Sequence, residues 1–188
     1  MQTIDIAGIK GMNILNNCHT YAPNDGQLLL GQGYAIFLSF LLPAGVMREG
    51  VRNATLNLYK TTFYKEPCRC YNQYYTVYPL LHECQPHSER FCAYAIDGNR
   101  KTFFLGEEGY QTNIDVTEIM NAWIDEGDRE GKLLLVDDYN SNLICYAATD
   151  YQISHMRPSI SLLCDNFYFT KPLSVERAFV KVSSTPKY

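Results

Sequence analysis

The residue types with the clearest capacity for chemistry gather between residues 68 and 92 of the chain. This stretch carries four thiols and two imidazoles: Cys68, Cys70, His82, Cys84, His87 and Cys92. Thiolates and imidazoles bind Zn²⁺ in tetrahedral sites, but zinc ribbons and fingers separate their paired cysteines by two or more residues. A Cys-x-Cys pair cannot easily place both sulfurs on one metal ion. The spacing therefore favours disulfide bonds within or between chains, or reduced thiols, over a zinc site.

The number of cysteines in the chain is odd. There are seven: Cys18, Cys68, Cys70, Cys84, Cys92, Cys145 and Cys164. An odd number leaves at least one thiol outside any pairing within the chain, so that it is free or pairs with another chain. We expect five candidates for cross-links: Cys18, Cys68, Cys70, Cys84 and Cys92, with at least one of the last four oxidised in the functional state. Reduced, buried thiols that behave as small apolar side chains are the alternative.

The acidic residues and the remaining histidines indicate no catalytic site. Carboxylates cluster at Glu107–Glu108, Asp137–Asp138 and Asp150, without the spacing of an EF-hand calcium loop. Solvated turns explain them better than a calcium site or a pair of glycosidase carboxylates. His19 and the lone His155 lack a visible partner that would orient them. The sequence therefore predicts a protein that is not an enzyme, with no catalytic residue, no metal ligand and no cofactor.

Composition favours a single β-rich domain. The chain has 188 residues, 46% of them hydrophobic, and its aromatic residues are dominated by 15 Tyr against 9 Phe and 1 Trp. Tyrosine suits a half-buried strand surface, because its ring packs while its hydroxyl stays in water. The tyrosines of Tyr71–Tyr75 could stack on sugars, but packing across strands is favoured.

Charge and hydropathy exclude two classes of partner. The net charge is −4 and the Lys and Arg residues are scattered, whereas nucleic-acid binding needs a clustered basic surface. The longest apolar run, Ile36–Leu42, is far too short to span a bilayer. We therefore expect no nucleic-acid partner and no membrane span.

Short β-like segments separated by turn residues occupy most of the chain. The expected strands are Thr3–Ile6, Met12–Leu15, Gln27–Leu30, Tyr34–Leu41, Ala54–Tyr59, Tyr74–Leu81, Lys132–Val136, Leu143–Ala148 and Pro158–Leu163. Tyr34–Leu41 is almost continuously apolar, which predicts a central strand. Ala54–Tyr59 alternates, with Thr55, Asn57 and Tyr59 on the face opposite the apolar one. Pro79 predicts that the strand carrying it ends at a sheet edge.

One segment has the period of a helix rather than that of a strand. Asp115 suits the N-cap position, and Glu118 follows three residues later, a variant of the capping box. Four apolar residues then fall at helical spacing: Val116, Ile119, Met120 and Trp123. Gly127 suits the position just beyond the end. We expect one short amphipathic helix over Asp115–Glu126, with Trp123 as its buried anchor.

Three pieces of the chain resemble the DNRLRE domain family of bacterial and archaeal surface proteins. The first joins the strand Phe37–Val46, with its Leu-Pro-Ala-Gly turn, to the strand Val51–Tyr59 with Ala-Thr-Leu-Asn-Leu-Tyr. The second is the helix segment Ile114–Ile124, with Asp-Val-Thr and Trp. The third pairs Gly131–Leu135 with Arg157–Leu162, similar to the closing strands of that family. Together they cover roughly residues 10 to 164.

This resemblance implies a fold and a set of roles. The fold is an all-β, antiparallel, jelly-roll-like β-sandwich with one short amphipathic helix crossing one end. The roles are non-catalytic: modules of cell surfaces, some of which bind acidic polysaccharide. We assign residues 1–165 to the sandwich and residues 166–188 to a strand-like C-terminal extension.

Two segments near the chain ends have strand patterns and lie at or beyond the limits of the resemblance. Their apolar faces are formed by Ile4, Ile6, Ala178, Val180 and Val182. A lone extended segment is ordered only when it joins a sheet edge and buries one face. We expect at least one of them to join an edge of a neighbouring subunit in a head-to-tail contact.

Two functions remain open from the sequence. The favoured one is a structural subunit that self-associates into a layer or filament at a cell or spore surface, made without a signal peptide. Its partner is then itself, with disulfides as possible cross-links. The alternative is a carbohydrate-binding module that recognises a polysaccharide. A cytoplasmic location is the alternative to the surface.

Overall fold

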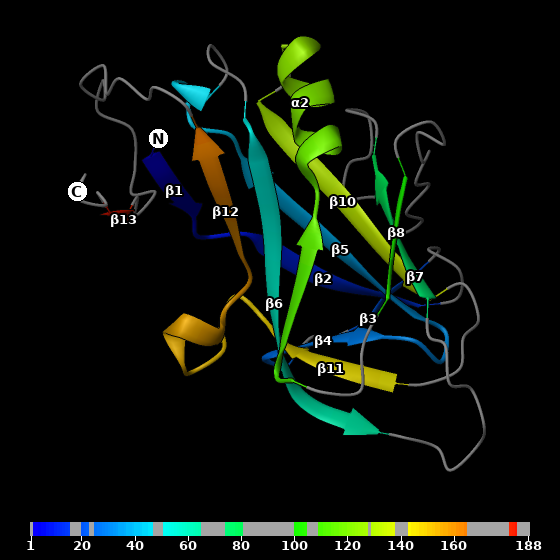
Figure 1. The fold of residues 1–188 in the computed structure, drawn as a ribbon. Helices are drawn as coiled ribbons and strands as arrows, with labels where there is room; N and C mark the ends of the chain where they lie inside the picture. Colours follow the sequence, from blue (N-terminus) through cyan, green and yellow to red (C-terminus); the bar gives the residue numbers. More distant parts are fainter. Residues whose placement is uncertain are drawn as a thin grey trace.

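The computed structural model describes the chain in ten ranges of residues. These are residues 2–15, 20–22, 25–46, 51–64, 74–80, 100–104, 109–127, 129–137, 143–164 and 181–183. Within them the protein is a sandwich of two antiparallel sheets with one α-helix (Figure 1). The predicted all-β antiparallel sandwich is therefore confirmed.

The two sheets draw their strands from all along the chain. The seven-stranded sheet has the order β13-β1-β12-β6-β11-β4, with β9 also paired to β6. Its strands are β1 (Gln2–Ile6), β4 (Gln27–Leu30), β6 (Asn53–Tyr64), β9 (Gln111–Asp115), β11 (Leu143–Ala147), β12 (Ser159–Cys164) and β13 (Lys181–Ser183). The six-stranded sheet has the order β3-β2-β5-β10-β7-β8. Its strands are β2 (Lys10–Leu15), β3 (Thr20–Ala22), β5 (Tyr34–Leu41), β7 (Tyr74–Pro79), β8 (Lys101–Phe104) and β10 (Glu130–Asp137).

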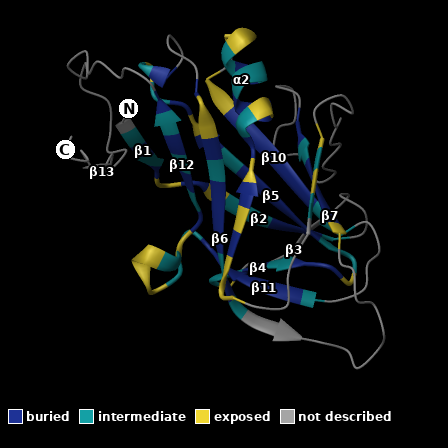
Figure 2. Ribbon diagram, in the orientation of Figure 1, coloured by how far each residue is buried: buried dark blue, intermediate teal, exposed yellow. Residues whose placement is uncertain are grey.

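The main hydrophobic core lies between the sheets, because alternate residues of each strand point inward. The seven-stranded sheet contributes mainly Ile4, Leu56, Leu58, Ile114, Ile160 and Leu162, and the six-stranded sheet Ile36, Leu38, Phe40, Leu133 and Leu135. All of these side chains are buried, as the dark strands in Figure 2 show.

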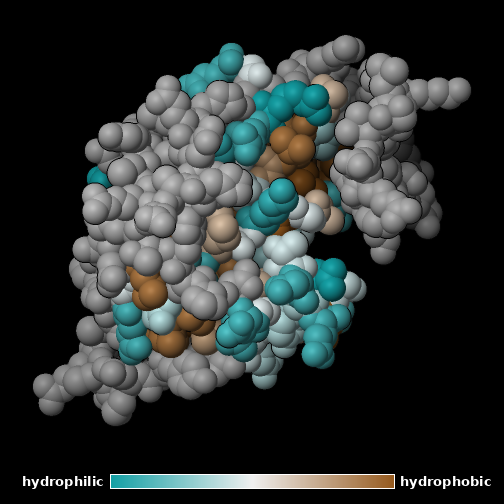
Figure 3. Space-filling model, turned by 180° about the vertical axis from the view of Figure 1, so that it is seen from behind, coloured by the Kyte–Doolittle hydropathy of each residue, from teal (hydrophilic) through white to brown (hydrophobic). Residues whose placement is uncertain are grey.

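The six-stranded sheet carries a second apolar cluster on its other face. Its buried members are Ile14, Ala35, Phe37, Leu80 and Leu134. β5 lies between β2 and β10 and is buried on both faces, which explains the nearly unbroken apolar run of Tyr34–Leu41. Seen from behind, hydrophobic atoms of the described residues are visible in two areas of the surface (Figure 3).

The predicted helix is present as α2 (Thr117–Asp125), which connects β9 of one sheet to β10 of the other. Ile119, Met120 and Trp123 form its buried side, as predicted. Gly127 follows the helix with φ of 75°, the left-handed conformation that glycine adopts at least cost. The predicted capping of the N-terminus is wrong by one position, because Val116 occupies the N-cap and no side-chain cap bond is made from it.

Asp115 nonetheless holds the first turn from one residue further out. Its Oδ1 accepts hydrogen bonds from the Thr117 backbone N–H at 3.0 Å and from the Thr117 hydroxyl at 2.6 Å. The Thr117 hydroxyl, followed by the Thr117 backbone N–H, lowers the pKa of the Asp115 carboxyl. The carboxylate therefore replaces the missing cap by binding the residue that begins the helix.

Replacing Asp115 with alanine is expected to lower the free energy of unfolding by about 0.5–1 kcal/mol near neutral pH. A carboxyl whose pKa is lowered on folding stabilises the fold above its unfolded pKa, and this contribution disappears as the pH falls through the folded value. Urea unfolding of both proteins across the acidic range measures the difference, which should shrink toward low pH. Asn113→Ala, an exposed change on the same strand, is the control. A difference independent of pH would contradict this role for the carboxylate.

The strand expectations need one confirmation and one correction. β7 lies between β10 and β8, but its pairing with β8 ends at Val77, so the end of β7 that carries Pro79 lies at an edge, as predicted. Pro79 is tolerated because it is the last residue of β7 and lies beyond Val77, where the pairing with β8 ends. β3, β8 and β9 were not expected, since each is short and lacks a strong apolar alternation.

Candidate functional site

The candidate cross-linking cysteines are not placed by the structure. Cys18, Cys68, Cys70, Cys84 and Cys92 lie outside the described residues, so their oxidation remains a prediction. Within the described ranges, Cys145 on β11 is a buried free thiol, and Cys164 on β12 is buried. Burial raises the pKa of the Cys145 thiol and so disfavours the reactive thiolate.

The other residues considered for chemistry are not gathered into one site. His155 is exposed in the 3₁₀ turn η2 (Ser154–Met156), Asp137 ends β10, and Asp150 lies in the turn after β11. Across the described ranges, no group of three or more His, Cys, Asp and Glu residues could hold a metal ion. His19, His82, His87, Glu107, Glu108 and Asp138 lie outside those ranges.

The tyrosines of Tyr71–Tyr75, which were expected to pack across strands rather than stack on sugars, differ in exposure. Tyr75 is completely buried and stacks on Phe103 of β8, with ring centroids 5.6 Å apart. Tyr74 is 42% exposed, and Tyr71 lies outside the described residues. Packing is therefore confirmed for Tyr75. The only tryptophan, Trp123, is buried and offers no stacking surface.

The two terminal segments pair with each other within the chain. β1 lies between β12 and β13, and its Ile4 and Ile6 are buried in the main core. β13 pairs with β1 through Thr3–Ser183, Ile4–Val182 and Asp5–Lys181 and is the outermost strand of its sheet. Val182 therefore belongs to a strand, while Ala178 and Val180 lie outside the described residues. β1 is an interior strand, and in this arrangement neither of its edges is open to a neighbour.

The opposite edge of the seven-stranded sheet is closed by a side chain from the other sheet. Asn13 of β2 is fully buried, and its amide binds the backbone of β4. Its Nδ2 donates to the Gln27 carbonyl at 3.0 Å, and its Oδ1 accepts from the Leu29 N–H at 2.7 Å. Asn13 thus occupies hydrogen-bonding groups of β4 that an added strand would need.

The outward face of the seven-stranded sheet carries short polar side chains in register. Asp5, Ser161, Thr55 and Asp115 lie opposite one another on β1, β12, β6 and β9. The neighbouring row on this face is formed by Ser159, Asn57 and Asn113. The row after that pairs Tyr59 with Gln111. These rows alternate with the inward rows of Ile and Leu, so that one face of each strand serves the core and the other is polar.

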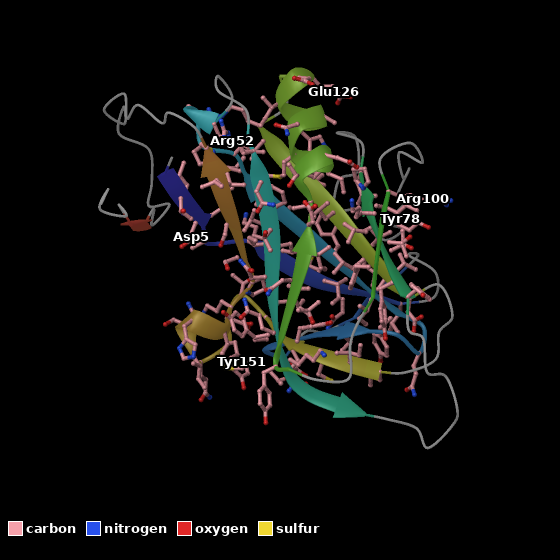
Figure 4. All side chains as sticks on the ribbon, in the orientation of Figure 1. Asp5, Arg52, Tyr78, Arg100, Glu126 and Tyr151 are labelled. Atoms are coloured by element: carbon pink, nitrogen blue, oxygen red, sulfur yellow. The ribbon has the colours of Figure 1, made fainter. Side chains whose placement is uncertain are left out.

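A chain of hydrogen bonds, here called the polar ladder, crosses four strands on this face. It consists of Gln111, Asn57, Ser161 and Asp5 (Figure 4 labels Asp5). Gln111 Nε2 donates to Asn57 Oδ1 at 3.4 Å, and Asn57 Nδ2 donates to Ser161 Oγ at 3.0 Å. Ser161 Oγ donates to Asp5 Oδ1 at 2.7 Å. Every donor points toward the carboxylate, so the groups polarise one another and hold fixed orientations.

One strongly exposed aromatic residue directly precedes the polar ladder in the chain. Tyr110 directly precedes Gln111, the first member of the ladder, and is 82% exposed. Its backbone is held in place, because its carbonyl accepts the Lys60 N–H at 2.6 Å. An exposed ring on a fixed backbone can stack on a sugar ring, and the exposed amide of Gln111, the next residue, can bind sugar hydroxyl groups.

A buried polar group lies under the same end of the sheet. The Tyr146 hydroxyl and the Thr112 hydroxyl are 3.2 Å apart in the interior, and Lys60 opposite Tyr146 is 9% exposed. Burial raises the pKa of Tyr146 and lowers the pKa of Lys60. Burial, followed by Asp137 and Tyr146, also raises the pKa of Tyr75. Both phenols therefore stay protonated near neutral pH, and the Tyr146 hydroxyl pairs with the Thr112 hydroxyl in the core.

The comparisons with known proteins identify no relative of this chain. No protein-family model matches the chain, and no curated protein is similar to it. The resemblance to the DNRLRE family therefore has no support beyond the residues that suggested it and remains a prediction. In the described part of the chain, no helix is long and apolar enough to cross a membrane.

The sequence did not predict the polar ladder, although it predicted the outward polar residues of one of the four strands. The outward side of Ala54–Tyr59 was expected to carry Thr55, Asn57 and Tyr59, and it does. The partners come from β1, β9 and β12, and no local pattern says which strands lie beside β6. The signal that could have raised the question is the run of short, uncharged polar residues at alternate positions of β6 and β12.

Proposed function

We propose that the protein is a non-enzymatic structural subunit that self-associates at a cell or spore surface into a layer or filament. The observation that carries this proposal is the position of β13. This three-residue strand from the far end of the chain forms the outer edge of the seven-stranded sheet and is paired to β1. A short edge strand on a long connection is a part that copies of one chain can share.

The test of this proposal is removal of the C-terminal segment. Deleting residues 171–188 removes β13 but leaves β1 paired to β12, so the sandwich is expected to fold. Sedimentation velocity should then show oligomers for the full chain and a monomer for the truncated chain at the same concentration. A full chain that sediments as a monomer under oxidising conditions contradicts the proposal.

Deleting residues 1–10 does not give an equivalent test. That truncation was expected to leave a folded sandwich, but it removes β1, which carries the buried Ile4 and Ile6 in the interior of the sheet. Loss of three core side chains, since Ile9 is also buried in the main core, and of a paired strand destabilises the fold itself. The C-terminal truncation is therefore the informative one, and reducing conditions applied to the full chain separate disulfide links from strand pairing.

A second candidate function is supported by a different observation. The polar ladder and the exposed ring of Tyr110 fit the alternative of a carbohydrate-binding module for a polysaccharide. The face is built from short, oriented donors and acceptors, and a polymer of sugars presents hydroxyl groups at a regular repeat.

Glycan-array binding by Tyr110→Ala and Gln111→Ala variants tests this second function. Both side chains are exposed, so their removal should preserve the fold and lower binding at least several-fold. Thr102→Ala, an exposed change on β8 of the other sheet, is the matched control and should bind as the unaltered chain does. Equal binding by all variants, or none by the unaltered chain, removes this candidate.

A further inference from the structure

Three strands form the edge of the seven-stranded sheet at which copies of the chain could pair: β12, β1 and β13. β1 is antiparallel to both of its neighbours, so β12 and β13 run parallel to each other with β1 between them. Asp5 faces Ser161 on one side and Lys181 on the other, while Gln2 faces Cys164. The last residue of β12, Cys164, and the first residue of β13, Lys181, therefore lie on opposite sides of β1.

The connection between these two residues is much longer than their separation requires. Two strand spacings across and three residues back along the sheet separate Cys164 from Lys181 by roughly 14 Å. The chain provides residues 165–180 for that distance, and a stretch of this length spans up to roughly 50 Å when extended. A connection this long lets β13 reach either the β1 of its own chain or the β1 of a second chain.

We propose that self-association proceeds by exchange of β13, so that the β13 of one copy pairs with the β1 of the next copy in the register Thr3–Ser183, Ile4–Val182 and Asp5–Lys181. This inference rests on the proposed function and names its partner, a second copy of this chain. The exchanged pairing repeats the pairing within the chain residue for residue. The balance between them is therefore set by protein concentration and by the connection, not by new contacts.

The other edges fit an assembly that uses β13 alone. The β4 edge is occupied by the Asn13 amide, and β3 and β8 at the ends of the six-stranded sheet have three and four residues. Short edge strands are weak templates for a foreign strand. Because donor and acceptor are different parts of the surface, the exchange is head-to-tail and extends into a chain of subunits unless it closes into a ring.

A cross-link between facing positions of β1 and β13 tests the exchange. The double variant Thr3→Cys with Ser183→Cys is prepared with ¹⁴N and with ¹⁵N, and the two are mixed in denaturant, refolded together and oxidised. Mass spectrometry of the peptide linking residues 3 and 183, taken from the oligomer fraction, should find mixed-isotope links as abundant as like-isotope links. Like-isotope links alone in a true oligomer overturn the exchange but keep the proposed function. The absence of any oligomer overturns both. Thr3→Cys alone is the control for links to the native cysteines.

A shortened connection gives an independent test that needs no added cysteine. Deleting residues 165–179 leaves one residue between Cys164 and Lys181, so the two can lie at most roughly 7 Å apart, about half of the roughly 14 Å that β13 needs to pair with its own β1. This variant is expected to be oligomeric at concentrations where the full chain is largely monomeric. A variant that sediments as a monomer at every concentration overturns the exchange, because β13 can no longer reach its own β1 and still does not pair with the β1 of another copy.

Discussion

Replacing Trp123 with alanine is expected to lower the free energy of unfolding by about 3–5 kcal/mol. Trp123 is 2% exposed, and its ring meets Phe40 edge-to-face with centroids 5.7 Å apart. Gly131 makes room for both rings, since a Cβ at that position would lie 2.4 Å from Phe40 and 3.0 Å from Trp123. Domains are typically stable by about 5–15 kcal/mol, so this loss is a large share of the total.

Urea unfolding followed by circular dichroism measures this loss. Trp123→Phe is the matched variant, because it keeps an aromatic ring against Phe40 and should lose clearly less stability than the alanine variant. Glu126→Ala changes an exposed residue just after the same helix and should have almost no effect. If alanine at position 123 unfolds at the same urea concentration as the unaltered chain, α2 is not anchored by this ring.

Replacing Asn13 with leucine is expected to lower the free energy of unfolding by about 2–4 kcal/mol. The change removes the fully buried Asn13 amide and leaves the part-buried Gln27 carbonyl and Leu29 N–H without that partner. Buried backbone groups that lose their partners cost more than the hydrogen bonds were worth. The same change opens the β4 edge, so the variant should also aggregate at concentrations where the unaltered chain does not.

The measurements for Asn13 are chemical unfolding and light scattering of the folded protein. Asn53→Leu is the matched control, because it makes the same substitution at an exposed position of β6. The control should unfold within about 0.5 kcal/mol of the unaltered chain. A loss of stability without any increase in scattering would show that Asn13 supports the core but does not protect the β4 edge.

Local patterns in the sequence were enough to predict the fold class. Strands with period-two alternation, the nearly unbroken apolar run of Tyr34–Leu41, and the helix with Trp123 on its buried side are all present. These features depend on residues within a few positions of one another. Gly127 was predicted for the same reason, since a left-handed residue after a helix is a local requirement.

The sequence was insufficient where a strand that is distant in the chain determines the position of a residue within its own element. Pro79 lies at an end of β7 that β8 does not reach, as predicted, but the sequence did not show that β8 pairs with the rest of that strand up to Val77. Asp115 has the chemistry of an N-cap, but the course of β9 through Asp115 moves the start of α2 to Thr117. In each case the residue type was interpreted correctly, and its position in the element was set by the strand beside it.

Only the tertiary structure decided which parts of the surface belong together. The apolar residues of the two chain ends predicted two strands, but their pairing with each other joins Thr3 to Ser183 across almost the whole chain. The polar ladder joins residues of β1, β6, β9 and β12, and Asn13 closes a strand of the opposite sheet. The physical reason is that alternation along a strand fixes which face is buried, whereas hydrogen bonding between strands depends on segments that are distant in sequence. The face that each strand buries can therefore be predicted from its own residues. The candidate surfaces of this protein form only when strands from distant parts of the chain pair side by side.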